Sequence, residues 1–413
     1  MNKRLIALVM SVIMIVSLFA GCGAAKEAPA AAPEAAVETA PEAAPAEGEK
    51  ETIKIGYLAS LTGSGAYTDM APLYAYQDYI EELNANGGLL GHPVELVAYD
   101  NTRDPLTESV TAVNKMIQQD NVIAVLGPTS SRAALTIVSL CNENKTPCIS
   151  ISATNEKVTV NETTGEVEPY MFRVCFIDSY QGTALGNFAA TDLGLTKVAT
   201  LGRIDDAYAQ GIIGYFEEAF EAGGGEVVES MGYQTGDVEF RAQLSLAAQK
   251  GAEAIMVPAT EYKDACLMGE QAKELGLEFV WLFPDGVYAS ELVEVGGEFL
   301  EGAFVCTGLF DDDPAYADYR DAFNEKHSSS GYTCNIYAYY ALDTIEFLVW
   351  AVEQAGSFDG EAIQKQLENA KDVPVFTDTL TVDPATHNPV NKTISLLQIV
   401  DSQYTLYKTF KPE

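Results

Sequence analysis

Residues 53–88 read IKIGYLASLTGSGAYTDMAPLYAYQDYIEELNANGG, and this stretch predicts how the chain folds. The run Ile53–Ala59 is short and apolar, which is typical of a buried strand. It is followed by the turn Thr62-Gly63-Ser64-Gly65 and by a helical pattern from Tyr67 to Asn86, which Gly87-Gly88 ends. The segment is therefore expected to form a strand, a turn and a helix, the repeating unit of α/β folds.

The same unit recurs along the next part of the chain. Further strands are expected over Val94–Tyr99, Val122–Leu126 and Pro147–Ile151. The helices expected between them cover Asp104–Gln119 and Arg132–Asn142. Strands that alternate with helices in this way predict a parallel sheet with helices on both faces.

The pattern restarts at Lys197, where Lys197–Gly202 is again a short apolar strand before a polar turn and an amphipathic helix. More strands are expected over Ala252–Val257, Phe279–Phe283 and Ala303–Thr307. The part from Thr52 to Glu413, roughly 360 residues, exceeds the usual size of one hydrophobic core. The predicted fold class is therefore α/β, with two doubly wound parallel-sheet lobes.

Three crossover segments are expected to join the two lobes. They are placed near Cys175–Asp178, near Thr307–Phe310 and near the start of a strand over Ile394–Val400. The aromatic stretch Tyr332–Val349 reads as a helix that packs back on the first lobe. Lobe 1 then comprises residues 52–177 and 308–392, and lobe 2 comprises residues 178–307 and 393–413.

The N-terminus has the pattern of a secretory signal, predicted over residues 1–21, with Lys3 and Arg4 before an apolar run. The following Cys22 resembles the lipidated cysteine of a bacterial lipobox, although Phe19 stands where that motif usually has leucine. The alternatives are an ordinary secreted protein or an N-terminal membrane anchor. The resemblance implies an extracytoplasmic protein, held by lipid on the outer face of the bacterial cell membrane.

Residues 22–51 combine this cysteine with a stretch that is almost entirely Ala, Pro and Glu. Such a stretch has too little apolar surface to offset its ordering entropy, so a disordered spacer is predicted. The formal net charge of −36 argues against binding to nucleic acid or to anionic lipid. It does not identify a ligand.

The cysteines and histidines do not predict a metal site. No two cysteines have C-x-x-C spacing, and His92, His327 and His387 are scattered along the chain. Cys141 and Cys148 are close enough in sequence to form a disulfide, and buried free thiols are the alternative.

Ligands of doubly wound sheets bind beyond the carboxyl ends of the strands, so the residues after each strand are the candidates. Gly127-Pro128-Thr129-Ser130-Ser131 precedes a helix, and its hydroxyl and N–H groups would hold an anion such as a carboxylate. Ser152-Ala153-Thr154-Asn155 follows the next strand with a second set of small polar groups. The alternative is that Ser130 and Thr154 only cap helices.

The second half of the chain has complementary residues. Asp205, Asp206 and Tyr208 follow its first strand, and Asp285 follows a later one. An acid opposite an anion seat would bind an ammonium group, and a tyrosine ring would cover a ligand. The alternatives are that Asp285 forms a turn and that Tyr208 is ordinary packing.

An exported α/β enzyme was weighed as a second class of protein. No G-x-S-x-G elbow, P-loop or complete G-x-G-x-x-G motif is present in the sequence. The paired acids Asp205-Asp206 and the run Asp311-Asp312-Asp313 read as turn and helix N-terminal charges. The sequence therefore predicts neither catalytic residues nor a cofactor.

Taken together, these residues resemble the solute-binding proteins of branched-chain amino acid ABC transporters, which have the type I periplasmic-binding fold. The resemblance covers Ile53 to Phe410 and depends on short motifs that occur in the right order. They are Leu61-Thr62-Gly63, Asn86 to Val94, Tyr99-Asp100, Gly127-Pro128 with Ser131, Ser152-Ala153-Thr154, Phe172-Arg173, Asp178 with Gln181-Gly182, Asp206 with Tyr208, and Asp285-Gly286.

The resemblance implies a role for each of several residues. Ser131 and Thr154 would hold the α-carboxylate of an amino acid with their hydroxyls and the nearby N–H groups, Ala153 included. Ser152, Thr154 and Asp285 would hold the α-ammonium group. Tyr208 would stack on the ligand from the second lobe, and Tyr67 would wall the pocket for its side chain.

Three departures from the family pattern lie where a ligand side chain would be. Thr68 replaces the usual glycine, Arg203 stands where the family often has an acid, and Ala259-Thr260-Glu261-Tyr262 differs from the usual loop. Arg203 would either face the ligand or pair with Asp205 or Asp206. Leucine, isoleucine or valine therefore cannot be assumed as the ligand.

The implied partners are a small ligand, an amino acid or a related compound, and the permease subunits of an ABC importer, with the protein acting as a monomer. A sensor that presents the same closed lobes to a receptor is the alternative.

Overall fold

The computed structural model describes residues 50–102, 106–390 and 392–411. The predicted signal peptide over residues 1–21, Cys22 and the spacer as far as residue 49 lie outside the described residues. Within these ranges, no helix combines the length and the apolar character that a membrane span requires.

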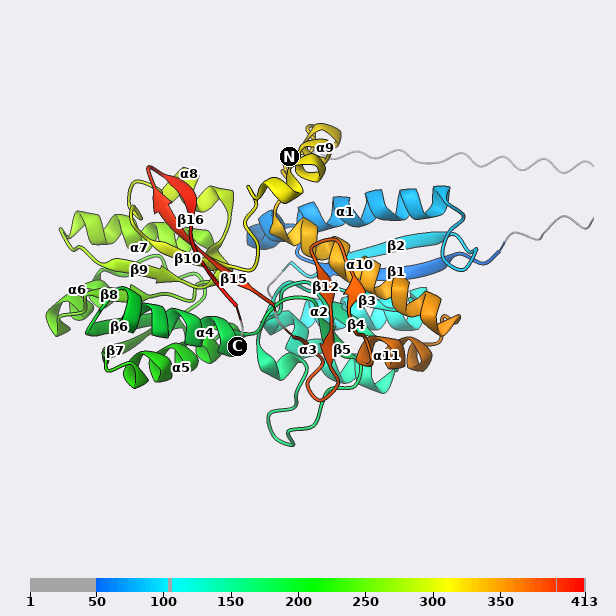
Figure 1. Ribbon diagram of the computed structural model, residues 1–413, viewed down its shortest axis with the longest axis horizontal. Helices are drawn as coiled ribbons and strands as arrows, with labels where there is room; N and C mark the ends of the chain where they lie inside the picture. The colour runs from blue at the N-terminus through cyan, green and yellow to red at the C-terminus, as the bar shows by residue number, and fades with distance from the viewer. Residues whose placement is uncertain (1–49, 103–105, 391, 412–413) are drawn as a thin grey trace, which may run out of the picture. The chain divides into compact units, whose positions relative to one another are not determined.

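The first lobe is built on five parallel strands in the order β2-β1-β3-β4-β5 (Figure 1). These strands are β1 (Ile53–Ala59), β2 (Val94–Asp100), β3 (Val125–Leu126), β4 (Cys148–Ser150) and β5 (Met171–Arg173). The helical segments between them are η1 (Gly63–Gly65), α1 (Ala66–Ala85), α2 (Thr107–Lys115), η2 (Met116–Asp120), α3 (Ser131–Glu143) and η3 (Glu156–Val158). The predicted strand–helix alternation is confirmed.

Both faces of the first sheet are buried, as its continuous apolar strands predict. Successive side chains of a strand point to opposite faces. Tyr57 therefore packs in one hydrophobic cluster with Tyr76 of α1, whereas the neighbouring Leu58 packs in another with Val113 of α2 and Ile137 of α3. Helices consequently cover the sheet on both sides.

The second lobe is built on seven strands in the order β16-β15-β10-β9-β8-β6-β7 (Figure 1). These strands are β6 (Lys197–Arg203), β7 (Glu226–Tyr233), β8 (Ala254–Met256), β9 (Val280–Phe283), β10 (Phe304–Thr307), β15 (Ile394–Val400) and β16 (Gln403–Phe410). The part β7-β6-β8-β9-β10 is parallel and repeats the strand order of the first sheet. The two lobes are therefore of similar build.

The strands β15 and β16 add an antiparallel edge to this sheet, which the expectation of a parallel sheet did not include. The physical reason is the path of the chain, because β15 follows a crossover from the first lobe instead of a helix of its own lobe. The helical segments of the second lobe are α4 (Asp178–Asn187), η4 (Phe188–Asp192), α5 (Ala207–Ala222), α6 (Arg241–Lys250), α7 (Tyr262–Glu274), η5 (Asp285–Val287) and α8 (Ser290–Gly296).

The chain leaves and re-enters the first lobe at three places. It passes between β5 and α4, between β10 and the following segment, and between residues 389 and 394 before β15. The segment after β10 contains η6 (Pro314–Tyr316), α9 (Ala317–Lys326), α10 (Ile336–Ala355), α11 (Gly360–Glu368), β11 (Val373–Pro374), β12 (Thr379–Leu380), β13 (Val382–Asp383) and β14 (Asn388–Pro389). The predicted helix in the aromatic stretch is α10, which contacts α1, β3 and β4 of the first lobe. The residue boundaries given for the lobes stay predictions.

The six cysteines of the described part are buried free thiols, Cys141 and Cys148 among them. The alternative of free thiols therefore holds for this pair.

Candidate functional site

The site lies where the strand order of each sheet reverses. In the first sheet, β2 lies on one side of β1 and β3 on the other. In the second sheet, β7 and β8 flank β6 in the same way. Loops at such a switch point form a crevice in doubly wound folds. A small cavity of about 40 Å³ lies here, and its walls come from both lobes. Its lining residues are Thr68, Thr129, Ser130, Ser131, Ser152, Thr154, Asp206, Tyr208, Thr260, Asp285, Gly286 and Tyr337.

The first-lobe wall contains the N-terminus of α3. Ser130 stands at the N-cap position, but its side chain makes no capping hydrogen bond, so the interpretation of Ser130 as a mere cap is not supported. Ser131 is buried, and its hydroxyl accepts a hydrogen bond from the N–H of Asn155 at 3.3 Å. The first N–H groups of a helix have no partner inside the helix and carry partial positive charge. This wall can therefore hold an anion.

A buried acid that the sequence analysis missed positions this wall. Asp69, in the first turns of α1, accepts hydrogen bonds from the hydroxyl of Thr129 at 2.7 Å, the hydroxyl of Thr68 at 3.0 Å and the N–H of Ser60 at 2.6 Å. Both hydroxyls belong to residues that line the cavity. Asp69 therefore holds two loops of the first lobe together.

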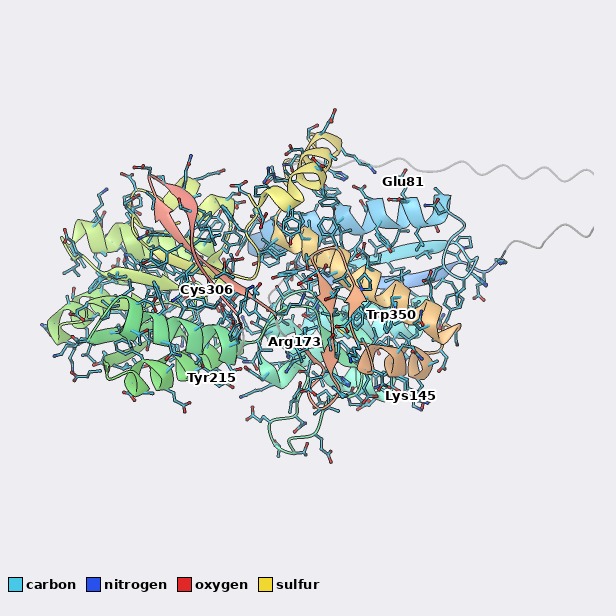
Figure 2. The ribbon with its side chains drawn as sticks, viewed as in Figure 1. Glu81, Lys145, Arg173, Tyr215, Cys306 and Trp350 are labelled. Atoms are coloured by element: carbon cyan, nitrogen blue, oxygen red, sulfur yellow. The ribbon has the colours of Figure 1, made fainter. Side chains whose placement is uncertain are left out.

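The loop after β4 places the predicted residues Ser152, Ala153 and Thr154. Thr154 is buried and lines the cavity, as does Ser152, whose hydroxyl donates to the carbonyl of Thr129 at 3.3 Å. Ala153 is buried behind the wall and does not line the cavity. Its carbonyl accepts a hydrogen bond from Arg173 at 2.6 Å (Figure 2).

The second-lobe wall is a chain of hydrogen bonds that ends on Asp285. Asp206 caps α5 by accepting from the N–H of Tyr208 at 3.0 Å, which confirms its interpretation as a helix N-terminal charge. The Tyr208 hydroxyl donates to Asp285 at 2.9 Å and accepts from the N–H of Gly286 at 2.9 Å. A Cβ at Gly286 would lie 2.4 Å from the carbonyl oxygen of Ala259, so only glycine allows this approach.

Asp285 is a buried acid whose charge lacks a cationic partner in the cavity. Gln181 donates to its carboxylate at 2.9 Å, and the Gln181 amide oxygen accepts from the N–H of Asp285 at 3.2 Å. Burial raises the pKa of Asp285 to about 6 and also raises the pKa of Asp206. No lysine or arginine is among the described residues that line the cavity. The second-lobe wall is therefore suited to an ammonium group.

Tyr67 and Asn155 connect the two lobes across the site. The Tyr67 hydroxyl donates to the carbonyl of Thr260 at 3.3 Å, and its ring meets that of Tyr262 edge to face at 5.2 Å. The Asn155 side chain donates to the carbonyl of Ala207 at 2.9 Å and to Asp178 at 3.2 Å. The structure therefore shows the lobes in direct contact around the cavity.

Arg203 is buried beside the site but does not line the cavity. Its guanidinium donates to the hydroxyl of Thr260 at 2.8 Å, and its Nε lies 3.8 Å from the carboxylate of Asp205. The interpretation that Arg203 pairs with a neighbouring acid is therefore confirmed.

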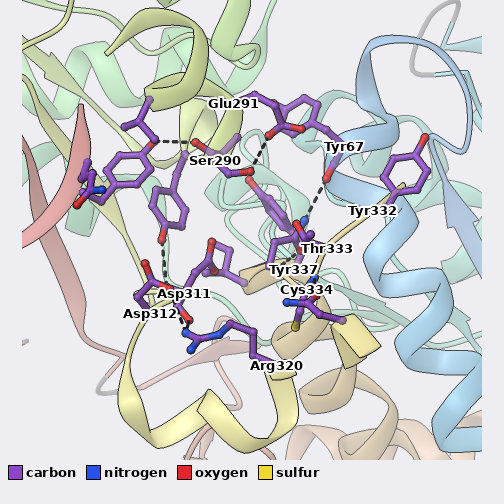
Figure 3. A pocket seen from close by; sticks show the side chains of 18 of the residues that line it. Tyr67, Ser290, Glu291, Asp311, Asp312, Arg320, Tyr332, Thr333, Cys334 and Tyr337 are labelled. Atoms are coloured by element: carbon purple, nitrogen blue, oxygen red, sulfur yellow. Dashed lines mark hydrogen bonds and ion pairs between the residues drawn. The ribbon is translucent and has the colours of Figure 1, made fainter. Parts of the chain in front are cut away.

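A second and larger cavity of about 510 Å³ adjoins the first, since Tyr337 lines both (Figure 3). Tyr67 lines the larger cavity, and the next residue, Thr68, lines the smaller one. The sequence analysis treated Tyr337 only as part of a packed helix. Within the described residues, no group of histidines, cysteines and acids could hold a metal ion.

Comparisons with known proteins agree with this geometry. The model of the family described as periplasmic binding protein matches residues 52–403. A leucine-, isoleucine-, valine-, threonine- and alanine-binding protein of Pseudomonas aeruginosa is 28% identical over 319 residues, which are 77% of this chain and 82% of that protein.

Two solved structures are similar over most of the chain. The leucine binding protein LivK of Thermotoga maritima has a TM-score of 0.78 and 28% identity, covering 87% of this chain and 99% of its own. The branched-chain amino acid substrate binding protein LivJ of Streptococcus pneumoniae, in complex with isoleucine, has a TM-score of 0.78 and 28% identity, covering 88% of this chain and 100% of its own.

Proposed function

Because the chain belongs to the periplasmic binding protein family, we propose that it captures an amino acid, branched-chain or related, for an ABC importer. The ligand lies between the two lobes and is delivered to the permease subunits by the protein as a monomer. The observation that carries this proposal is the buried Asp285–Tyr208 pair, which lies across one cavity from the N-terminus of α3.

The two walls of the cavity match the two charges of an α-amino acid. The carboxylate is held by the hydroxyls of Ser131 and Thr154 and by the first N–H groups of α3. The ammonium is held by Asp285, which is oriented by Tyr208 and Gln181, with Ser152 on the opposite side. Charge-assisted hydrogen bonds of this kind are about twice as strong as neutral ones, so both charges contribute to affinity.

The relatives support an amino acid as the ligand. One is named for five neutral amino acids, and LivJ was solved with isoleucine. The family is one of binding proteins, so the prediction that the chain is not an enzyme is confirmed and the alternative of an exported enzyme is set aside.

The membrane attachment is part of the same proposal. Cys22 carries the lipid, and the Ala/Pro/Glu stretch up to residue 51 spaces the binding domain from the outer face of the membrane.

A ligand screen tests the function. The purified protein is heated with each of the common amino acids, with amides and with small carboxylates, and the melting temperature is recorded. A ligand that binds the folded state raises it by mass action. At least one amino acid is expected to do so, and the same amino acid at the same concentration should shift the melting temperature of Asp285→Asn protein much less. A shift with carboxylates that lack an ammonium group, and with no amino acid, would refute the proposal.

A further inference from the structure

The larger cavity indicates which kind of side chain the bound amino acid has, and this inference depends on the proposed function. The smaller cavity has a volume of about 40 Å³, and one water molecule needs about 10–15 Å³ of such volume. It therefore has room for a few atoms, such as the α-carbon of an amino acid with its two charged groups. A longer side chain must leave this cavity, and the larger one lies beyond Tyr337 and Tyr67.

The charges that line the larger cavity are mostly negative (Figure 3). Its acids are Glu291, Asp311 and Asp312, and its cation among the described lining residues is Arg320. The Arg320 guanidinium is already engaged. It donates to the carbonyl of Asp311 at 2.9 Å and to the carboxylate of Asp312 at 3.1 Å, and its Nε lies 3.5 Å from the carboxylate of Asp321. The guanidinium lowers the pKa of the Asp311 carboxyl, but its hydrogen bonds go to the Asp311 carbonyl and to Asp312.

Asp311 is an acid whose charge is only partly compensated by its neighbours. Its residue is partly buried, and its Oδ1 atom is fully buried without a hydrogen-bond partner among the described residues. The nearby Tyr288 hydroxyl accepts from the N–H of Asp311 at 3.1 Å. Burial raises the pKa of Asp311 to about 7. The Tyr288 hydroxyl, the N–H of Ile336 and the Arg320 guanidinium oppose this rise only in part, so a further cation beside the carboxylate would lower the remaining cost of its buried charge.

The remaining walls also favour a cation. Five tyrosines line the larger cavity: Tyr67, Tyr288, Tyr332, Tyr337 and Tyr404. The faces of aromatic rings attract ammonium and guanidinium groups, and the aliphatic stem of such a side chain packs well on the same rings.

We propose that this cavity receives the ligand side chain, and that the ligand is an α-amino acid whose long side chain ends in an ammonium or guanidinium group. Asp311 is the partner of that cation. An aliphatic side chain would add no cation to compensate the Asp311 carboxylate, and an acidic one would add repulsion from three carboxylates.

Calorimetric titration of the intact protein at pH 8, where Asp311 is ionised, tests the class of ligand. The probes are lysine and arginine, norleucine as an uncharged match for lysine, leucine, and glutamate. Lysine or arginine is expected to bind at least about tenfold more tightly than norleucine and leucine, since a hydrogen bond to a charged group is worth that much. Equal or tighter binding of leucine or norleucine overturns this inference and leaves the proposed function intact. Binding of no amino acid at all would overturn both.

A variant identifies the partner of the cation. Asp311→Asn is expected to weaken lysine or arginine at least about tenfold and to leave norleucine within about twofold. The matched control is Asp313→Asn, since Asp313 is exposed, caps η6 and does not line the cavity. Equal losses in the two variants would refute the role of Asp311. If Asp311→Asn does not fold, the ranking of ligands by the unmodified protein still tests whether the ligand side chain is cationic.

Discussion

Two aspartates of this protein each accept a hydrogen bond from a tyrosine hydroxyl, and the comparison between them tests the role of Asp285. Tyr208 donates to Asp285 at 2.9 Å inside the small cavity, and Tyr233 donates to Asp264 at 2.9 Å outside it. Burial raises the pKa of both acids to about 6. Asp285 is buried whereas Asp264 is half-buried, and of the two acids Asp285 lines the cavity and Asp264 does not.

Asp285→Asn is expected to weaken ligand binding by at least about 30-fold at pH 8, because the buried ammonium would lose its charged partner, at a cost of about 2–5 kcal/mol. Asp264→Asn should bind as the unmodified protein does. Isothermal titration of both variants gives the comparison. A loss of less than about twofold in Asp285→Asn would show that this residue does not hold the ammonium.

The same experiment has a pH dependence with a definite sign. Protonation of Asp285 removes its charge, so affinity is expected to fall as the pH drops through about 6. In Asp285→Asn this part of the pH profile should be absent, whereas Asp264→Asn should retain it.

The residues of the site were not equally predictable from the sequence. The topology of a doubly wound fold predicts ligand-binding residues directly after the strands, and this is where Asp206, Tyr208 and Asp285 lie. Asp69 and Gln181 lie inside the first turns of helices, where polar residues are ordinary. Their roles depend on bonds to Thr129 and Asp285, which are distant in sequence. A local sequence pattern does not predict a hydrogen bond between residues that are this far apart in the chain.

Arg203 is expected to have no direct part in selecting the ligand. It pairs with Asp205 and bonds to Thr260, and it does not line either cavity. Arg203→Met should therefore leave the ranking of amino acids in a thermal-shift screen unchanged, even if the melting temperature of the unliganded protein falls. A new preference for aliphatic amino acids would show that the guanidinium reaches the ligand.

At the scale of the elements, Arg173 fixes the loop that follows β4. It is fully buried and donates to the carbonyls of Ala153 and Asn155 at 2.6 and 2.8 Å, and to the hydroxyl of Thr159 at 3.0 Å. These bonds connect the end of β5 to the loop that contains Thr154. Arg173, which does not line the cavity, therefore positions the loop that is proposed to bind the ligand carboxylate.

Arg173→Met is expected to lower the free energy of unfolding by about 2–4 kcal/mol, because three buried acceptors would lose their donor. It should also weaken ligand binding more than about tenfold at a temperature where the variant is still folded, since the loop would no longer be fixed. Denaturant unfolding and titration measure the two effects. Arg241→Met is the control, since the Arg241 side chain is 40% exposed and pairs with Glu239 and Glu274. Normal binding by folded Arg173→Met would contradict the positioning role.

The elements themselves were predicted best where both faces are buried. The bounds of β1 match the prediction, because its apolar run lies inside a sheet, and β2, at the edge of the same sheet, extends one residue beyond its predicted end. The edge strands β7 and β16 were not predicted. β7 is half-buried and β16 is largely exposed, and both mix charged with apolar residues, so their pattern does not differ enough from that of a loop. The predicted strand Val122–Leu126 pairs only over Val125–Leu126, because the ladder begins after the turn.

At the scale of the whole molecule, the proposed lipid anchor at Cys22 would determine where the binding domain works. Cys22→Ala is expected to release the protein from the membrane fraction or to leave the signal uncut, because two acyl chains are needed for stable attachment. Cell fractionation and the mass of the mature N-terminus measure this. An unmodified Cys22 in the native protein, with the same fractionation for both forms, would refute the anchor.

In the proposed function the two lobes hold opposite ends of the ligand, and this would require the molecule to close. Ser131 and Thr154 belong to one lobe, and Tyr208 and Asp285 to the other. A ligand that contacts both sets binds the closed arrangement better than an open one, and this difference in affinity drives the equilibrium toward closure. Contacts such as the bond from Tyr67 to Thr260 then join the lobes around the ligand.

Small-angle scattering of the protein with and without a saturating ligand is therefore expected to show a smaller radius of gyration on binding. Asp285→Asn, at a ligand concentration that saturates only the unmodified protein, should remain in the open form. The closed surface is what a permease would recognise, so transport requires no chemical change of the ligand, and the ligand should be recovered intact. An unchanged radius of gyration at saturation, or turnover of the ligand, would exclude the closing mechanism.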